Sequence, residues 1–389
     1  MAVPLLDVNA QNLPLEAELK ATFERVLRSG QFIMGPDVAA LEKEIAAMTG
    51  ARHAIGVSSG TDAILLALMA LDIKAGDEVL CPSYTFFATG GCIARTGATP
   101  VFVESCPACF NMDFEDAAAK LTNRTKAIMP VHLFGQSADM DPILEFAKER
   151  KLPVIEDAAQ ALGAEYHGRQ IGTMGTFGTY SFFPSKNLGG FGDGGMLVSN
   201  DDALAEKARL LRTHGAKPKY YHKLVGANFR LDSLQAALLR VKLPHYVRYT
   251  ANRRANANFY CEKLSLNPHV KISSACDCRT AKKSLGLSEA KIILPVAHPG
   301  NSHIWNQFTL RVPGQRDAFR TALTHKGIGT EIYYPVPLHQ QECFSALPAR
   351  RLPVAEQLAQ EAISIPVYPE LTATQREEVV SAVNDFLQN

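Results

Sequence analysis

The chain has 389 residues, of which 47% are hydrophobic and 20% are charged, and a chain of this length usually folds into about two or three compact units. Its 40 lysines and arginines nearly balance 39 aspartates and glutamates, which leaves a formal net charge of +1. This balance argues against nucleic acid or an acidic membrane surface as a partner. The longest apolar run, residues 63–71, has about half of the ~20 residues that a membrane-spanning helix needs.

The beginning of the chain lacks the basic segment, apolar core and cleavage site of a secretory signal, so we expect a cytoplasmic protein with reduced thiols. Cys106 and Cys109 have the spacing of metal ligands, but the second pair, Cys276 and Cys278, is too closely spaced for an ordinary zinc ribbon. We therefore expect cysteines in surface turns and no metal site.

Short apolar runs alternate with stretches of helical periodicity in the first part of the chain. In chain order, a helix is predicted over 62–71, strands over 78–80, 100–103, 127–131 and 153–155, and a helix over 140–151, between the third and fourth of these strands. Strands without polar alternation are buried on both faces, so this part of the chain is predicted to form a mainly parallel sheet covered by helices.

The composition changes near residue 245. The following predicted elements are a long polar helix over 246–264, a Ser/Cys/Lys-rich stretch over 273–290, a strand over 308–312, a helix over 316–326 and a last helix after Thr372. We therefore predict a large α/β domain over residues 1–245 and a smaller α+β domain over 246–389. No motif could be assigned to residues 273–302.

Small residues lead directly into the first of these helices. Residues 56–61 read Gly-Val-Ser-Ser-Gly-Thr, and a helix that starts this way offers free N–H groups and a positive dipole end to a phosphate. A plain Ser/Thr N-cap is the alternative. A Walker loop is excluded because no Gly-Lys-Ser/Thr follows.

Asp157 follows the apolar run 153–155 at the predicted end of a strand. Ligands of open α/β sheets bind outside the carboxyl ends of the strands. An acid in this place can equally be a helix cap.

Lys186 lies between the apolar segment 179–184 and a glycine-dense loop over 189–195. A lysine held against apolar side chains and compact backbone has a reason to lose its proton and to act as a nucleophilic amine. The alternative is a solvated loop lysine. The glycines do not have the spacing of a dinucleotide-binding fingerprint, which argues against a nicotinamide dehydrogenase.

Together, these three features match the three parts of pyridoxal 5′-phosphate that a protein must hold: its phosphate, its ring nitrogen and its aldehyde. The sequence resembles the pyridoxal-phosphate-dependent nucleotide-sugar aminotransferases of the DegT/StrS type from about residue 32 to the C-terminus. The motifs that carry the resemblance are Ser59-Gly60-Thr61-Asp62-Ala63, Pro82-Ser83-Tyr84-Thr85-Phe86, Val131-His132-Leu133-Phe134-Gly135-Gln136, Glu156-Asp157-Ala158-Ala159-Gln160, Ser181-Phe182-Phe183-Pro184-Ser185-Lys186 and Asn228-Phe229-Arg230-Leu231-Asp232.

The resemblance implies the type I fold of pyridoxal-phosphate transferases and a role for each matching residue. Lys186 would form the Schiff base and move the proton, and Asp157 would pair with the ring nitrogen. The other implied cofactor contacts are Gln160 to the ring hydroxyl, Ala159 and Phe86 to the two ring faces, Gly60, Thr61 and Ser181 to the phosphate, and Asn228 to the phosphate of a neighbouring subunit in a homodimer. Arg230, Tyr333, Tyr334 and His339 fall where family members meet the sugar nucleotide.

The resemblance also implies the reaction: transfer of an amino group, with L-glutamate as the donor, to a nucleotide-linked 3- or 4-ketosugar in the synthesis of aminosugars for polysaccharides or natural products. Tyr333 stands where many relatives have histidine, and this favours a neutral or N-acetylated sugar over a glucuronate. Lys186 favours transamination over the related dehydratases, which have histidine there. A cyclitol or aromatic substrate remains an alternative, as does a non-catalytic regulatory homologue.

Overall fold

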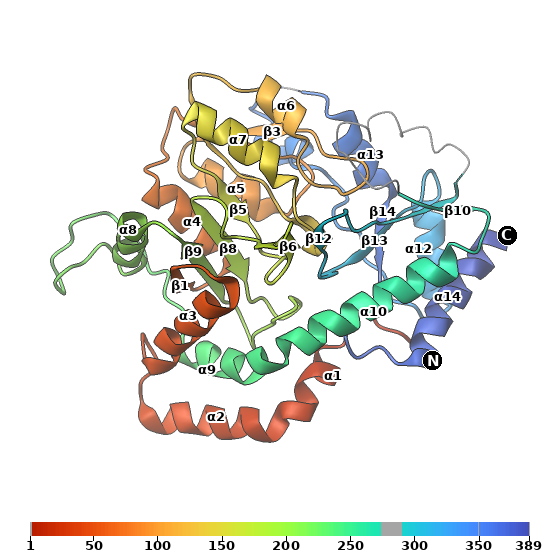
Figure 1. Ribbon diagram of the computed structural model, residues 1–389, viewed down its shortest axis with the longest axis horizontal. Helices are drawn as coiled ribbons and strands as arrows, with labels where there is room; N and C mark the ends of the chain where they lie inside the picture. The colour runs from red at the N-terminus through yellow and green to blue at the C-terminus, as the bar shows by residue number, and fades with distance from the viewer. Residues whose placement is uncertain (1, 274–289, 349, 389) are drawn as a thin grey trace.

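The computed structural model describes residues 2–273, 290–348 and 350–388 (Figure 1). Seven strands form its larger sheet: β1 (His53–Val57), β2 (Glu78–Pro82), β3 (Thr99–Val103), β4 (Thr125–Ile128), β5 (Ile155–Asp157), β8 (Phe177–Ser181) and β9 (Gly195–Ser199). The strand orders β3-β2-β4 and β5-β8-β9-β1 are joined by parallel bridges from Ile128 to Val154 and from Val131 to Asp157. β9 pairs antiparallel with both neighbours and the other pairings are parallel. The prediction of a mainly parallel sheet is confirmed.

Helices surround this sheet (Figure 1). They are α3 (Pro36–Thr49), α4 (Gly60–Ala70), α5 (Phe87–Arg95), α6 (Phe114–Ala119), α7 (Met140–Arg150) and α8 (Asp202–Arg212). α4 is apolar on most of its circumference because α5, α8, β8 and β9 all pack against it. It thus carries the predicted phosphate-binding segment into the centre of the molecule.

The remaining helices of the N-terminal two thirds lie beneath the sheet in Figure 1. α1 (Val8–Asn12) and α2 (Glu16–Ser29) precede α3, while α9 (Ser233–Lys242) packs on both α2 and α3. α10 (Tyr246–Leu264) then extends from this region to the second sheet, and its bounds confirm the predicted helix over 246–264.

A second sheet has the order β10-β11-β13-β14, with β10 (Val270–Ile272), β11 (Ile292–Leu294), β13 (Phe308–Arg311) and β14 (Ala362–Ile365). α12 (Arg316–His325), α13 (Pro353–Glu361) and α14 (Ala373–Gln388) accompany it, while β6 (Glu165–Tyr166), β7 (Arg169–Gln170) and β12 (Asn301–Ser302) form a small third sheet. Val354, Ala355 and Leu358 of α13 pack into the core of the first sheet. The division into domains at residue 245 stays a prediction.

Cys106 and Cys109 are 1% and 4% exposed, so the expectation of surface cysteines is wrong for this pair. Two backbone hydrogen bonds close their turn, from the N–H of Phe110 to the carbonyl of Cys106 and from the N–H of Cys106 to the carbonyl of Asn111, and the two cysteines pack with Ala108 in a small buried cluster. Within the described residues, no group of three or more His, Cys, Asp or Glu side chains is arranged to hold a metal. Cys276 and Cys278, and most of the stretch without an assigned motif, lie outside the described residues. None of the described helices is long and apolar enough to cross a membrane.

Candidate active site

A cavity of about 420 Å³ opens where β5 and β8 end and α4 begins. This is the carboxyl edge of the sheet, where ligands of open α/β folds bind. Ten of the predicted site residues line the cavity: Gly60, Thr61, Phe86, Asp157, Ala159, Gln160, Ser181, Lys186, Tyr333 and Tyr334.

The start of α4 forms one end of the cavity. Ser59 is the N-cap, since its Oγ accepts the N–H of Asp62 at 3.0 Å, so the plain capping interpretation is also correct. A Cβ on Gly60 would lie 2.8 Å from the Cβ of Ser181, and only glycine permits this close approach. The first N–H groups of the helix and the Ser181 hydroxyl are thereby gathered where a phosphate would fit.

Asp157 is 5% exposed, and each of its two carboxylate oxygens accepts one hydrogen bond. Thr89 Oγ1 donates to one oxygen at 2.7 Å, and the N–H of Ala159 donates to the other at 3.3 Å. Burial raises the pKa of the carboxyl group, against the opposing effect of the hydrogen bond from Thr89. A cation placed against this carboxylate would remove the cost of its burial, as a protonated pyridine nitrogen would.

Lys186 lies in the tight turn that follows β8. Its N–H bonds the carbonyl of Phe183 at 2.8 Å, and the N–H of Gly190 bonds the carbonyl of Phe182 at 2.7 Å. Burial lowers the pKa of the Lys186 amine to about 8, although the nearby charge of Asp157 acts in the opposite direction. Part of the amine is therefore neutral and nucleophilic close to neutral pH. A solvated lysine, the alternative interpretation, would keep its proton at this pH.

The side-chain amide of Gln160 is held by two hydrogen bonds, one with the backbone of Phe134 and one with the hydroxyl of Tyr334. Its Oε1 accepts the N–H of Phe134 at 2.7 Å, so its amide nitrogen faces the Tyr334 hydroxyl at 3.1 Å. The ring of Tyr334 lies 6.1 Å from that of Phe86 between centroids. Gln160 and Phe86, with Ala159, thus face the same cavity from separate segments.

Several described residues at the cavity carry no local signal in the sequence. Thr89 reaches Asp157 from α5, 68 positions away. Asn306 and Gln307 line the cavity, and the side-chain nitrogen of Asn306 bonds Asn187, the neighbour of Lys186, at 2.9 Å. A search for polar residues beside strand ends would have found Thr85 and Ser185, but not a pair that arrives from the second sheet.

Three predicted residues do not line the cavity. Asn228 is exposed, and Arg230 bridges to Val57 with its Nε buried and without a partner among the described contacts. Nδ1 of His339 lies 2.7 Å from the Ser83 hydroxyl, and its Nε2 lies 3.3 Å from Glu356. The geometry therefore gives His339 the task of holding its own turn, and its predicted contact with the substrate has no support from this arrangement.

A family model described as the DegT/DnrJ/EryC1/StrS aminotransferase family matches residues 14–384. The chain belongs to this family. It is a pyridoxal-phosphate-dependent aminotransferase with the type I fold of these enzymes, which confirms the predicted family, fold, activity and cofactor.

Relatives match along their whole length. The chain is 46% identical, over 100% of both chains, to a protein of Geobacillus stearothermophilus named pleiotropic regulatory protein. It is 42% identical to the UDP-N-acetyl-3-dehydro-α-D-glucosamine 3-aminotransferase of Acidithiobacillus ferrooxidans, over 99% of this chain and 98% of that protein. A crystal structure of S. venezuelae DesV in complex with a ketimine intermediate superposes with a TM-score of 0.91, at 41% identity, over 100% of this chain and 99% of that one.

Proposed function

We propose that this aminotransferase moves an amino group from L-glutamate to the keto group of a nucleotide-linked sugar whose ring carries no acidic group. The lining of the cavity carries this proposal. Lys186 is the only cationic side chain among the described lining residues, and it is needed for the cofactor. A sugar carboxylate would therefore have no counter-charge from these residues. Hydroxyl and acetamido groups, in contrast, could form hydrogen bonds with the side chains of Tyr333, Asn306 and Gln307.

The positions of the chain's own residues support a role for each of them in this reaction. Pyridoxal phosphate supplies an electron-withdrawing ring that stabilises negative charge at the carbon that loses its proton. Asp157 keeps the ring nitrogen protonated. Lys186 would hold the cofactor through its amine and would carry the proton at its Nζ. The first turn of α4 and Ser181 hold the phosphate, and Gln160 orients the ring hydroxyl.

The similarity to the UDP-N-acetyl-3-dehydro-glucosamine enzyme supports a 3-ketosugar with an N-acetyl group. We predict that, in a panel of nucleotide-linked ketosugars with glutamate, mass spectrometry will detect amination of N-acetylated and neutral 3-ketosugars. We expect the matched 3-ketoglucuronate to react about tenfold or more slowly, because an unpaired charge would be buried in the cavity. Faster reaction of the glucuronate would contradict the proposed neutral ring.

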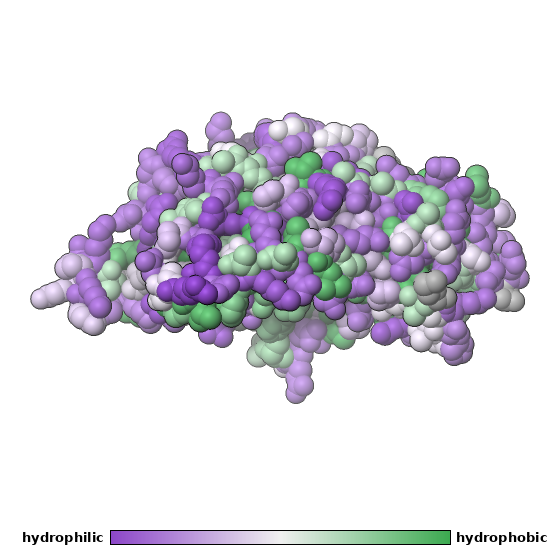
Figure 2. Space-filling view, turned by 90° about the horizontal axis from the view of Figure 1, so that it is seen from below, coloured by the Kyte–Doolittle hydropathy of each residue, from purple (hydrophilic) through white to green (hydrophobic). Residues whose placement is uncertain are grey.

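We also propose a homodimer in which Asn228 and Arg230 act in the partner's site. Both lie outside their own cavity, and Arg230 leaves a buried Nε without a partner among the described contacts. Phe23 and Leu27 of α2 and the segment 32–34 are exposed large hydrophobics, and Figure 2 shows hydrophobic residues interrupting the polar surface on the side nearest α2 and α9. A second copy would cover them, and Arg230 of the partner subunit would supply the cation that a diphosphate needs.

Mixed dimers test this arrangement. Lys186→Ala chains and Arg230→Ala chains should each be inactive with a nucleotide-linked ketosugar. Unfolding and refolding them together should restore up to about a quarter of wild-type activity, because half of the dimers are mixed and each has one complete site. Subunit exchange, confirmed by native mass spectrometry, without recovery of activity would contradict a shared site.

A regulatory role without catalysis is the second candidate, suggested by the name of the relative from Geobacillus stearothermophilus. The intact pair of Lys186 and Asp157 in one cavity supports catalysis instead. An enzyme for a cyclitol or an aromatic substrate would use the same cofactor-binding residues. It would, however, aminate none of the nucleotide-linked ketosugars in the panel described above.

A further inference from the structure

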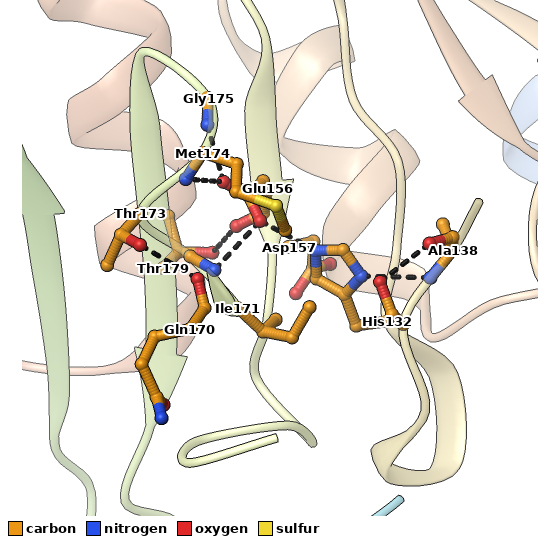
Figure 3. Close-up of polar contacts among 12 residues, drawn as sticks. His132, Ala138, Glu156, Asp157, Gln170, Ile171, Thr173, Met174, Gly175 and Thr179 are labelled. Carbon is orange, nitrogen blue, oxygen red and sulfur yellow. Dashed lines mark hydrogen bonds and ion pairs between the residues drawn. The ribbon is translucent and has the colours of Figure 1, made fainter. Parts of the chain in front are cut away.

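Glu156 precedes Asp157 on β5, so its side chain points to the opposite face of the strand. Its carboxylate is fully buried and is surrounded by donors (Figure 3). The N–H groups of Met174 and Gly175 donate to Oε1 at 2.8 and 2.6 Å, while the N–H of Gly172 and Nε2 of His132 lie 2.8 and 3.1 Å from Oε2. Four donors satisfy an ionised carboxylate and leave no acceptor for a carboxyl proton.

His132 completes this group from the segment after β4. The N–H of Ala138 donates to Nδ1 at 3.1 Å, so Nδ1 must carry a lone pair and Nε2 must carry the proton. The imidazole is therefore neutral, and it donates from Nε2 to Glu156. The geometry fixes both the charge of the carboxylate and the tautomer of the ring.

Glu156 and His132 connect three segments that carry or support site residues: β5, the segment after β4, and the turn 172–175 before β8. The backbone of Asp157 bonds to the segment after β4 on both sides, since its N–H reaches the carbonyl of Pro130 and its carbonyl accepts the N–H of His132, each at 2.9 Å. The turn 172–175, bound by Glu156, leads into β8, whose end carries Ser181 and then Lys186. A shift of Glu156 or His132 would thus change the separation between Asp157 and the segment that bears Lys186.

We propose that Glu156 and His132 are positioning residues that hold Asp157 against the ring nitrogen of the cofactor. The inference rests on the proposed role of Asp157 and not on the identity of the sugar. Neither residue lines the cavity, so they act through the main chain and not by contact with the reacting atoms. Asp157 can stabilise the positive charge on the ring nitrogen of the cofactor only when its carboxylate is closely aligned with that nitrogen. A small displacement of Asp157 would therefore slow the reaction.

Two substitutions of His132 separate the link to Glu156 from the link to Ala138. His132→Gln can place an amide N–H donor near the Nε2 position and so keep the contact with Glu156. His132→Asn can place an acceptor near the Nδ1 position and so keep only the contact with Ala138. We expect the maximal single-turnover rate constant with glutamate to fall by about ten- to a hundredfold in His132→Asn, with a small change in the glutamate concentration that gives half of this rate. In His132→Gln the rate constant should be largely retained.

The visible absorption band of the bound pyridoxal phosphate gives a readout other than turnover. When Asp157 no longer faces the ring, the ring loses positive charge and the cofactor holds its remaining titratable proton more tightly. The midpoint of the band in a pH titration should therefore rise by about one unit in His132→Asn and in Glu156→Gln, but not in His132→Gln. Equal single-turnover rate constants and equal midpoints in the two His132 variants would overturn the proposal.

The buried ion pair of Arg311 with Glu361, 2.8 Å apart, offers a matched control. Glu361→Gln should lower the melting temperature without moving the band midpoint. If Asp157→Asn itself leaves the midpoint unchanged, the role of Asp157 is wrong; if Asp157→Asn moves it and His132→Asn does not, only the present inference fails. Should the His132 variants not fold, ¹⁵N NMR of histidine-labelled wild-type holoenzyme decides the question. A proton found on Nδ1 of His132, the ring beside Glu156, would overturn the proposal.

Discussion

Lys186→Ala should abolish transamination, with a loss of turnover on the order of 10³-fold or more, because no other described lining residue supplies an amine to the cofactor. Borohydride reduction of the wild-type holoenzyme followed by peptide mapping should place the pyridoxyl group on Lys186. The apoprotein should also capture the cofactor faster as pH rises from about 7 to 9, because the pKa of this amine is lowered to about 8.

Lys242 provides the control for that experiment. Lys242 is a buried lysine, and burial lowers its pKa to about 8 as well. Its Nζ, however, bonds the carbonyl of Gly189 at 2.6 Å, and it does not line the cavity. Lys242→Met should keep the label on Lys186. A pyridoxyl group found on Lys242, or on any lysine other than Lys186, would refute the assignment.

Asp157→Asn should retain the cofactor but lose about 10²- to 10⁴-fold in the rate constant of the glutamate half-reaction, since the carboxylate acts mainly by stabilising charge that develops during the reaction. The amide oxygen can still accept the hydrogen bond from Thr89, so the fold of the site should persist. Single-turnover absorbance changes with glutamate measure the effect without any sugar.

The second carboxylate that lines the cavity, Asp193, serves as the comparison. Asp193→Asn removes the same charge from an exposed position and should have an effect at least about tenfold smaller than Asp157→Asn. Comparable losses in the two variants would mean that the cavity needs negative charge in general and not an anion at Asp157.

The sequence predicts best what depends on neighbouring residues. The apolar run 153–155 predicts a buried strand, and Asp157 then emerges at the carboxyl edge of the sheet, as the structure shows. The glycine-rich flank of Lys186 similarly predicts a compact loop. Such features depend on periodicity and steric limits within a few residues, which a single sequence records.

Long-range contacts escape this reasoning. No local pattern marks Thr89 as the partner of Asp157, nor Asn306 as a neighbour of the segment that bears Lys186. The motif predicts His339 at the substrate, whereas the contacts that the structure gives its ring are to the hydroxyl of Ser83 and the carboxylate of Glu356. Motifs place the segment, while packing against distant residues decides where each side chain points.

The buried carboxylate of Asp157 also has a cost for the protein prepared without cofactor. A carboxyl group whose pKa is higher in the folded chain than in the unfolded chain reduces stability once the pH exceeds the unfolded value, and the reduction grows up to the folded value. At neutral pH the apoprotein therefore carries an electrostatic strain that a positively charged ring relieves on binding. Relief of this unfavourable burial thus contributes part of the free energy of cofactor binding. The buried carboxylate lowers the stability of the apoprotein, and the same carboxylate is the group that the reaction needs.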